Sequence, residues 1–365
     1  MEIRKAILTG GGRATRLHPI TTTINKHLLP LANKPMIFHA IEKAIESGIR
    51  EIYINVNPGE TELQKHIGDG GHWGIKIQYF EQTGGPQGIA HVVNEAKQFI
   101  GDEPFMFYLS DNILLGSLKD LIQKFNEGRH DCMLALSEVP DPERFGVPIF
   151  DESGTKLIDV LEKPVNPPNN YAVTGIYLYG PKVFFESYKN IEPSARGEYE
   201  ISSIHSDFLK RGLSVGYKEI TGWWKDTGKS NDLLLASKLL LENILEKDYI
   251  QYSQIGNTSS VQGKVHIGIG TRILENVHIT GPVIIGENCV LHNCSLGPHV
   301  TLGSGVEIQG AKISNSIILE NSVLSVPMHI TGSIIGKNVS IVQKPTIGAE
   351  EGREMIIGDK THIEL

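Results

Sequence analysis

The first thirty residues place a glycine-rich turn and several cationic side chains directly after an apolar stretch, residues 3–8, that predicts a β-strand. Consecutive glycines let backbone N–H groups approach a ligand closely. Arginine and lysine bind the oxygens of a di- or triphosphate. The turn and the polar residues after it are Gly10, Gly11, Gly12, Arg13, Thr15, Arg16 and Lys26. This segment therefore indicates a phosphate-bearing ligand, and a nucleotide is the simplest one.

The glycines alone are also compatible with a tight strand-to-helix turn that binds nothing. The dinucleotide fingerprint GxGxxG fits at Gly10 and Gly12 but fails because Thr15 occupies the third glycine position. The Walker A pattern fails because no Gly-Lys-Ser/Thr closes the loop. Phosphate binding is thus predicted without either of these two motifs.

Acidic residues follow two other predicted strands. Ligands of open α/β sheets bind beyond the carboxyl ends of the strands, and Asp111 comes directly after the apolar run 105–109. Asp226 lies in the segment 222–228, which contains two tryptophans. Mg²⁺ needs only one or two carboxylates, because substrate phosphates and water complete its shell. The two aspartates are candidate Mg²⁺ ligands, although each could instead cap a turn or a helix.

A second polar group combines cations with carboxylates. Glu162 and Lys163 end a predicted strand, and Arg196 precedes a predicted helix, where it could clamp a phosphate or pair with neighbouring acids. We find no Ser/His/Asp or Cys/His pattern that would predict a covalent nucleophile. Phosphates, Mg²⁺ and several cations together indicate phosphoryl or nucleotidyl transfer, in which the protein positions groups and neutralises charge.

Two regions must position these residues, and they differ in rhythm. Up to about residue 249, apolar runs alternate with amphipathic segments, which is typical of βαβ units in an α/β, Rossmann-like, mostly parallel sheet. The runs are 3–8, 51–56, 76–80, 105–109 and 132–136, and the amphipathic segments are 36–47, 88–99 and 117–126. Residues 231–247 predict one long helix that leaves this domain.

A six-residue rhythm replaces the helical one after residue 251. Its aliphatic positions are Val261, Ile267, Ile273, Ile279, Ile285 and Leu291, followed after one slip by Leu296, Leu302 and Ile308, and after another by Ile313, Leu319, Ile335, Ile341 and Ile347. Hexapeptide repeats of this kind predict a parallel β-helix. We expect residues 327–329 to form a loop that interrupts the coils. The predicted domains are 1–248 and 249–365.

The bulk composition is that of a globular protein. Of 365 residues 40% are hydrophobic and 21% charged, and the net charge of −8 without a basic cluster argues against nucleic-acid binding. We recognise neither a secretion signal nor a membrane-spanning run, and three cysteines are poor material for a disulfide framework. A cytoplasmic location is expected.

The motifs, taken in order, closely resemble those of the sugar-1-phosphate nucleotidylyltransferases. They are Gly11-Gly12-Arg13-Ala14-Thr15-Arg16-Leu17 with Lys26 and Leu28-Leu29-Pro30, Asn33-Lys34-Pro35-Met36, Gly88-Ile89-Ala90-His91, Ser110-Asp111-Asn112, Phe145-Gly146-Val147, Glu162-Lys163-Pro164, Tyr171-Ala172-Val173-Thr174-Gly175, Arg196-Gly197-Glu198 and residues 222–228. With its hexapeptide tail the chain resembles the long form of the glucose-1-phosphate thymidylyltransferases. The resemblance implies a nucleotidyltransferase domain followed by a left-handed β-helix, and a Mg²⁺-dependent reaction of dTTP or UTP with glucose 1-phosphate that releases pyrophosphate.

The same resemblance implies roles for single residues. The residues implied to act in catalysis are Arg16, Lys26, Asp111, Lys163 and Asp226, of which the two aspartates would bind the metal. Those implied to bind the nucleotide are Gly11, Gly12, Arg13, Thr15, Gln82, Gly88 and Asn112. Those implied to bind the sugar phosphate are Gly146, Glu162, Lys163, Thr174 and Arg196.

Three departures from the family pattern stand out. Ala14 replaces a loop glycine, Ser110 replaces the usual glycine before Asp111, and the segment 82–88 is one residue longer than usual. Another base or sugar therefore stays open, as in GDP-mannose or UDP-N-acetylglucosamine synthesis. Two further alternatives are a second, acyltransferase activity in the β-helix and a non-catalytic regulatory paralogue. We expect a homo-oligomer, either a dimer or a tetramer.

Overall fold

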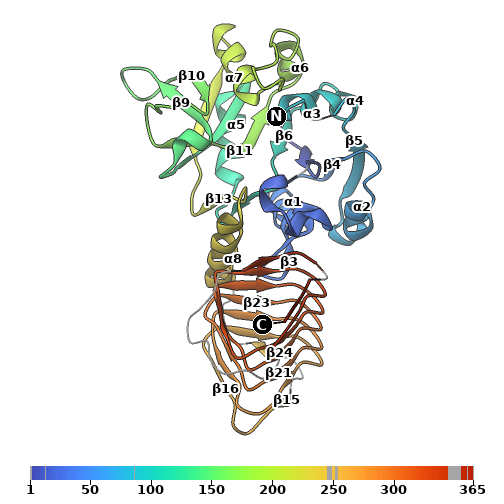
Figure 1. The fold of residues 1–365 in the computed structure, drawn as a ribbon. Coiled ribbons are helices and arrows are strands. Elements are labelled where there is room, and N and C mark those ends of the chain that lie inside the picture. The colour runs from blue at the N-terminus through green and yellow to red at the C-terminus, as the bar shows by residue number, and fades with distance from the viewer. Residues whose placement is uncertain are drawn as a thin grey trace. The chain divides into compact units, whose positions relative to one another are not determined.

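A computed structural model describes residues 2–12, 14–85, 87–244, 249–250, 254–343, 355–359 and 361–364 (Figure 1). The chain forms two compact units. Unit 1 consists of Met1–Gly12 and Ile37–Asp226, and unit 2 consists of Arg13–Met36 and Thr227–Leu365. The predicted domain boundary between residues 248 and 249 borders residues outside these described ranges and stays a prediction. The assignment of segment 13–36 to unit 2 has no counterpart in the sequence analysis.

Unit 1 is built on a nine-stranded sheet, and the Rossmann-like α/β fold is confirmed. Its central strands β6, β1, β4 and β5 are parallel, whereas β11 runs antiparallel to β6, β8 and β9. The order is β10 (Leu157–Glu162), β9 (Gly146–Phe150), β11 (Tyr171–Tyr179), β6 (Phe105–Tyr108), β1 (Lys5–Thr9), β4 (Glu51–Val56) and β5 (Lys76–Glu81), with β8 (Cys132–Glu138) on β11 and β12 (Val215–Glu219) on β8. The alternation of strands and helices did not indicate the antiparallel pairing in this half of the sheet.

Helices accompany the sheet of unit 1. The helix α1 shows why they form, because Ile37, Ala40, Ile41 and Ala44 lie at the spacing of one helix face and all four are fully buried. The others are α2 (Glu62–Ile67), α3 (Ile89–Glu95), α4 (Lys97–Ile100), α5 (Lys119–Gly128), α6 (Val183–Ser187) and α7 (Ile201–Lys210), and α1 itself spans Met36–Glu46. The segment 88–99, predicted as one amphipathic stretch, is thus divided into α3 and α4.

Unit 2 contains a long helix, α8 (Ser230–Ile244), and a parallel β-helix made of three sheets. The first sheet has β14 (Tyr249–Ile250), β17 (Val265–Ile267), β20 (Val283–Ile285), β23 (Val300–Leu302), β26 (Ser316–Ile318), β29 (Ile334–Ile335) and β31 (Ile356–Ile357). The second has β15 (Gln254–Ile255), β18 (Arg272–Ile273), β21 (Val290–His292), β24 (Glu307–Gln309), β27 (Val323–Ser325), β30 (Ser340–Val342) and β32 (His362–Glu364). The third has β16 (Ser260–Gln262), β19 (His278–Thr280), β22 (Ser295–Leu296), β25 (Lys312–Ser314) and β28 (His329–Thr331).

The hexapeptide repeat marks the inward-facing residues of these coils. Eleven of its aliphatic positions belong to the core of the coils and are at most 1% exposed: Ile267, Ile273, Ile279, Ile285, Leu291, Leu296, Leu302, Ile308, Ile313, Ile335 and Ile341. At Leu319 the repeat is wrong by one residue, because the core residue there is Ile318. The slips of the repeat reflect coils of unequal length, because Ile267 pairs with Ile285, Ile285 with Leu302 and Leu302 with Ile318. Ile347 lies outside the described residues.

The interrupting loop that we expected at residues 327–329 is wrong. His329 begins β28 and pairs with Lys312 of β25, so the ladder continues through this point. Pro327 forms only a corner of the coil, and Met328 packs its side chain inside. A proline at a corner costs no ladder hydrogen bond, which explains why the coil tolerates it.

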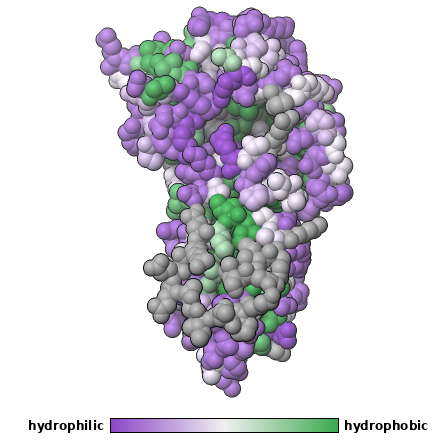
Figure 2. Space-filling model, viewed as in Figure 1, coloured by the Kyte–Doolittle hydropathy of each residue, from purple (hydrophilic) through white to green (hydrophobic). Residues whose placement is uncertain are grey.

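The outer edge of the unit 1 sheet exposes an apolar patch. The strand β10 pairs on one side only, and Figure 2 shows apolar side chains gathered over the β9–β10 region. Ile158, Leu161 and Val165 are the large exposed hydrophobic residues here.

All three cysteines of the chain are buried and free. Within the described ranges, no helix combines the length and apolar character needed to cross a bilayer.

Candidate active site

A small two-stranded ladder fixes the end of the segment that carries Asp111. The strand β7 (Asn112–Leu114) pairs antiparallel with β13 (Trp224–Asp226), and Asn112 stands opposite Asp226. The Asn112 side chain is buried, and its Oδ1 accepts hydrogen bonds from Gly175 N at 3.1 Å and Trp224 Nε1 at 3.0 Å. Its Nδ2 donates to Asp111 Oδ1 at 2.9 Å. One amide thus ties three segments together beside the two predicted metal ligands.

The ladder register brings Asp111 and Asp226 to the same end of this small sheet, because Asp226 faces the residue directly after Asp111. Both residues are partly exposed, and the Asp226 side chain is 22% exposed. Among the described residues no group of three or more His, Cys, Asp or Glu side chains could hold a metal. The site is therefore no closed protein cage. Two carboxylates with the remaining positions open to phosphate and water fit Mg²⁺.

A cation also lies beside this pair. Arg144 ends the short 3₁₀ turn η5 (Pro142–Arg144), and its Nη2 is 3.9 Å from Asp226 Oδ2. Its Nη1 binds Asp141 Oδ2 at 2.6 Å, which directs the guanidinium. Sequence reasoning did not single out Arg144, because an arginine in a polar loop carries no signal by itself. In the folded chain it adds positive charge next to the carboxylates, where anionic substrates would gather.

A buried tyrosine links the aspartate pair to the second polar group. Burial raises the pKa of Tyr177, and the charges of Glu162, Cys132 and Asp111 raise it further, in that order. Asp111 and Glu162 therefore act electrostatically on one phenol of strand β11. The raised pKa keeps this buried phenol neutral, so it adds no charge near the two acidic positions.

The second group clusters Glu162, Lys163 and Arg196. Lys163 Nζ lies 2.6 Å from Glu162 Oε1, and Arg196 Nη2 lies 3.4 Å from the same oxygen. Arg196 Nη2 also binds Glu200 Oε1 at 2.7 Å, and this hydrogen bond is the main reason why the Arg196 pKa is raised. Ser202 Oγ donates to Glu162 Oε2 at 3.1 Å. Both cations are about half exposed, so a phosphate could reach them.

The strands β9 and β10 explain why these residues meet. Glu162 pairs with Gly146 at the open end of the two strands, and Gly146 also pairs with Val173 of β11. Lys163 follows with a positive φ of 44° and donates its backbone N–H to Phe145 O at 2.9 Å. Gly146 therefore lies next to the carboxylate of Glu162, as a sugar-binding role would require.

Thr174 differs from the other predicted sugar-binding residues. Its side chain is fully buried, and its hydroxyl donates to Ala135 O of β8 at 3.0 Å. The hydroxyl thus serves the sheet, and a contact of Thr174 with a ligand would have to use its backbone. The sequence could not reveal this, because a polar residue in a buried strand resembles a site residue.

Two asparagines that sequence reasoning missed hold the glycine turn. Asn55 Oδ1 accepts from Gly10 N at 3.1 Å, and Asn57 Oδ1 accepts from Gly12 N at 2.9 Å. A Cβ on Gly11 would lie 2.8 Å from Asn55 Nδ2, which explains the need for glycine there. The available signal was their place at the carboxyl end of the predicted strand 51–56. That strand is β4, the parallel neighbour of β1.

Gln82 and Gly88, which are predicted to face the base, belong to the loop between β5 and α3. Thr83 donates its backbone N–H and its hydroxyl to Glu95 Oε2, at 3.1 and 2.7 Å. Gly88 has a φ of 91°, and a Cβ there would lie 2.6 Å from Tyr199 O. Gln82 is partly exposed at the start of this loop, and Pro86 lies outside the described residues. The loop geometry thus requires Gly88, while base contacts of Gln82 stay a prediction.

The remaining phosphate-binding candidates lie in unit 2, and Arg13 falls outside the described residues. Thr15 and Arg16 form the short 3₁₀ turn η1 (Thr15–Leu17), which follows Ala14. Ala14 has φ 45° and ψ 38°, so this position does adopt the left-handed conformation that glycine prefers. Lys26 begins a second turn, η3 (Lys26–Leu28), whose cap Asn25 accepts from His27 N at 2.9 Å.

Comparisons with known proteins give the family of the chain. The nucleotidyl transferase family profile matches residues 5–243, and the GMPPB C-terminal domain profile matches residues 279–364. The chain is 35% identical over 363 residues to the low-salt glycan biosynthesis nucleotidyltransferase Agl11 of Haloferax volcanii, covering 99% of this chain and 100% of that protein. It is 34% identical over 362 residues to glucose-1-phosphate thymidylyltransferase of Streptomyces antibioticus, covering 99% of each.

A solved structure shares the fold of about two thirds of the chain. It comes from Bacillus anthracis, contains sucrose and is assigned provisionally to the glucose-1-phosphate thymidylyltransferases. The TM-score is 0.60 at 38% identity, and the match covers 65% of this chain and 94% of that one. With the full-length relatives and the matching C-terminal profile, this chain belongs to the sugar-1-phosphate nucleotidyltransferases, in the long form that carries a C-terminal β-helix.

Proposed function

We propose that this enzyme transfers a nucleoside monophosphate from dTTP or UTP to glucose 1-phosphate, with Mg²⁺, and releases pyrophosphate. The observation that carries the proposal is the β7–β13 ladder, which sets Asp111 and Asp226 at one strand end. Full-length similarity to a thymidylyltransferase supports the choice of base and sugar.

The chemistry requires charge control more than acid–base catalysis. A phosphate oxygen of the sugar phosphate attacks the α-phosphorus, one P–O bond forms, and the P–O bond to the leaving pyrophosphate breaks. The nucleophile is already an anion, so no general base is needed, and the obstacle is repulsion between two anions. Mg²⁺ held by Asp111 and Asp226 would neutralise charge on the α-phosphate and orient it.

Two pairs of cationic side chains would bind the phosphate groups of the two substrates. Arg16 and Lys26 would bind the triphosphate, as the family motif implies, and Lys163 and Arg196 would hold the phosphate of the sugar. Glu162 already contacts both Lys163 and Arg196, so a phosphate entering there would share these two cations with a carboxylate. While it shares these cations, the Glu162 carboxylate could still accept hydrogen bonds from sugar hydroxyl groups with its remaining lone pairs, next to the backbone of Gly146.

A substrate matrix tests the proposal. Each of dTTP, UTP, GTP, ATP and CTP is incubated with glucose 1-phosphate, mannose 1-phosphate or N-acetylglucosamine 1-phosphate, with and without Mg²⁺, and pyrophosphate is measured. We expect the fastest release from dTTP or UTP with glucose 1-phosphate, and none without a divalent ion. A different preferred pair would reassign the substrates, and no release from any pair would contradict the reaction. Light scattering of the purified enzyme tests the expected homo-oligomer.

A further inference from the structure

The segment that carries Arg16 and Lys26 is attached to the β-helix. It ends in a hairpin of β2 (Pro30–Leu31) and β3 (Lys34–Pro35), whose turn residues Ala32 and Asn33 have φ values of 48° and 59°. Two positive φ angles are typical of a type I′ turn. At its tip Asn33 Nδ2 donates to Leu302 O of β23 at 2.6 Å. The hairpin is thereby joined to the backbone of one coil.

A second attachment lies on the other side of Lys26. Thr23 follows the 3₁₀ turn η2 (Ile20–Thr22), and its hydroxyl donates to Asp359 Oδ2 at 2.6 Å. The other oxygen of the same carboxylate accepts from Lys337 N at 2.7 Å. Asp359 therefore bridges the segment to a coil corner, and its position does not depend on Thr23 alone.

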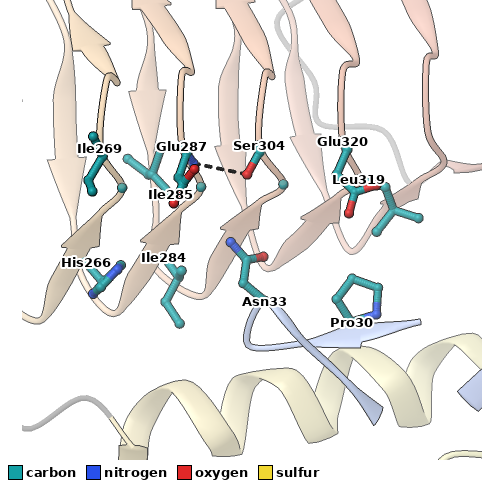
Figure 3. A pocket seen from close by; sticks show the side chains of 13 residues that line it. Pro30, Asn33, His266, Ile269, Ile284, Ile285, Glu287, Ser304, Leu319 and Glu320 are labelled. Atoms are coloured by element: carbon teal, nitrogen blue, oxygen red, sulfur yellow. Dashed lines mark hydrogen bonds between the residues drawn. The ribbon is translucent and has the colours of Figure 1, made fainter. Parts of the chain in front are cut away.

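Packing does not fill the space around the first attachment. A pocket of about 240 Å³ lies between Pro30 and Asn33 on one side and the coil corners at Gly286 and Gly303 on the other. Figure 3 shows Asn33 extending from the hairpin toward the coils across this space. Because the atoms that line the pocket lack packing partners there, the hydrogen bond of Asn33 is a direct link between the hairpin and the coil across a loosely packed region.

Short connections transmit both attachments to the phosphate-binding residues. Lys26 lies three residues after Thr23 and seven before Asn33, and Leu29 N donates to Lys26 O at 3.0 Å. Met36 N donates to Leu29 O at 3.0 Å, which closes the hairpin base. On the other side, Thr21 Oγ1 donates to Ala14 O at 2.8 Å, next to Thr15 and Arg16. A displacement of either anchor would therefore move the cations.

We propose that Thr23 and Asn33 are positioning residues that fix the phosphate-binding segment on the β-helix. The β-helix then sets the position of Lys26 and Arg16, and its role is to hold part of the nucleotide site. The inference deepens the proposed function, since it takes the triphosphate contacts of Arg16 and Lys26 from it. It assigns no chemistry to Thr23 or Asn33 themselves.

The test removes each attachment without changing the backbone that carries it. Asn33→Gly keeps a residue that favours positive φ but deletes the amide, and Thr23→Val keeps the shape but deletes the hydroxyl. Both single variants and the double variant are made in the full-length enzyme. The matched controls are Asn338→Gly, at a β-helix turn with φ 56°, and Thr280→Val, at an exposed position of β19.

Two measurements test the proposal: hydrogen exchange tests the attachment itself, and steady-state kinetics tests its effect on nucleotide binding. Either result can contradict the proposal without the other. Amide hydrogen exchange of residues 14–31 should become about tenfold faster in the double variant, because local opening is no longer opposed by two hydrogen bonds. The KM for dTTP should rise by about fivefold or more, while the KM for glucose 1-phosphate stays within about twofold. The controls should match the wild type in both respects.

Unchanged exchange in the double variant would overturn the attachment, whatever the activity. Faster exchange with equal changes in both KM values would overturn the positioning role, because general loosening of the site does not distinguish the substrates. If the wild type releases no pyrophosphate, the proposed function fails. In that case amide hydrogen exchange still tests the attachment. The affinity of the variants for Mg·dTTP then tests whether the attachment positions the cations.

Discussion

Asp226 stands opposite Asn112 across the β7–β13 ladder, and Asn112 in turn donates a hydrogen bond to the carboxylate of its neighbour Asp111. Two residues 115 positions apart in the chain, Asp111 and Asp226, are thereby held at one strand end. The ladder makes their position a property of the backbone. It also makes Asn112 a structural requirement for the site, separate from any contact it has with a nucleotide.

We expect Asp111→Asn and Asp226→Asn each to lower kcat/KM by about 10²–10³-fold, because each removes one charged ligand of the metal. The amide has almost the shape of the carboxylate, so the fold should be retained. Initial rates of pyrophosphate release at several Mg²⁺ concentrations measure the effect. Part of the loss should be recovered at high Mg²⁺ if metal affinity is what has changed.

The control for these variants is Asp207→Asn on α7, an acid that pairs with Arg211 away from the aspartate pair. It should retain the wild-type rate. If the double variant Asp111→Asn with Asp226→Asn still releases pyrophosphate at the wild-type rate, the assignment of both metal ligands is wrong. Mn²⁺ titration followed by electron paramagnetic resonance then reports whether the ion binds elsewhere.

Replacing Asn112 by Ala should destabilise unit 1 by about 2–4 kcal/mol, because Gly175 N–H and Trp224 Nε1–H lose their acceptor in a buried place. All three tryptophans of the chain, Trp73, Trp223 and Trp224, belong to unit 1. Urea unfolding followed by tryptophan fluorescence therefore reports on this unit. A variant as stable as the wild type would show that the two donors find other acceptors.

Much of the fold could be predicted from the periodicity of apolar residues. In a repeated coil the buried position recurs at a fixed spacing, and this spacing can be recognised without knowing the tertiary contacts. Between Ile267 and Ile341 the repeat named the inward residues correctly except at Leu319, because each coil offers the same environment, and at Leu319 a shorter coil moves the inward position to Ile318. It failed at Pro327, where proline was taken as a break although a coil corner needs no N–H donor at that point. The strand that ends at Glu162 was predicted, but its antiparallel direction was not, because the direction of a strand depends on its pairing with distant strands and leaves no local pattern.

From the sequence we could single out candidate site residues only where a charged residue stands at the end of a predicted strand or before a predicted helix. Asp111, Lys163 and Arg196 end strands or precede a helix, and the fold does bring Lys163 and Arg196 together around Glu162. Asn55, Asn57 and Arg144 were missed because their roles arise from partners distant in sequence. Thr174 shows the converse, since its hydroxyl is used by the sheet. Contacts of this kind depend on tertiary structure.

Lys163→Ala and Arg196→Ala should raise the KM for glucose 1-phosphate by about 10–100-fold, the loss expected for a hydrogen bond between charged groups. The KM for dTTP should stay within about twofold. Steady-state kinetics with one substrate saturating separates the two constants. Lys156→Ala, at the exposed far end of the β9–β10 connection, is the matched control and should change neither constant.

Gly11→Ala should lower kcat/KM by about 10–100-fold, because a Cβ at this position would lie 2.8 Å from Asn55 Nδ2 and 3.2 Å from Asn57 Oδ1. The glycine turn must then shift away from the asparagines that hold it. Gly71→Ala is the control, since neither Gly71 nor Gly11 has a positive φ and the atom nearest to its added Cβ is the side-chain oxygen Asp69 Oδ1, at 3.1 Å in an exposed turn. Equal kinetics for Gly11→Ala and wild type would show that the turn does not contact substrate.

The stability of unit 1 should fall in acid partly because of His205 on α7. This side chain is fully buried, and burial lowers its pKa from 6.5 to about 3. The ring is therefore neutral in the folded protein between these pH values, whereas in the unfolded chain it takes up a proton below pH 6.5. Since the unfolded state binds more protons in this window, the free energy of unfolding decreases as the pH falls from 6.5 toward 3.

The contribution of one such histidine approaches about 1.4 kcal/mol per pH unit within that window and vanishes above pH 6.5. His205→Gln removes the titrating ring and offers Tyr179 Oη, now 2.9 Å from His205 Nε2, another acceptor. The variant should lose stability less steeply between pH 6.5 and 4.5, measured by urea unfolding with tryptophan fluorescence. The exposed His66→Gln should keep the wild-type slope. An unchanged slope in His205→Gln would mean that the neutral buried imidazole does not govern acid unfolding of this unit.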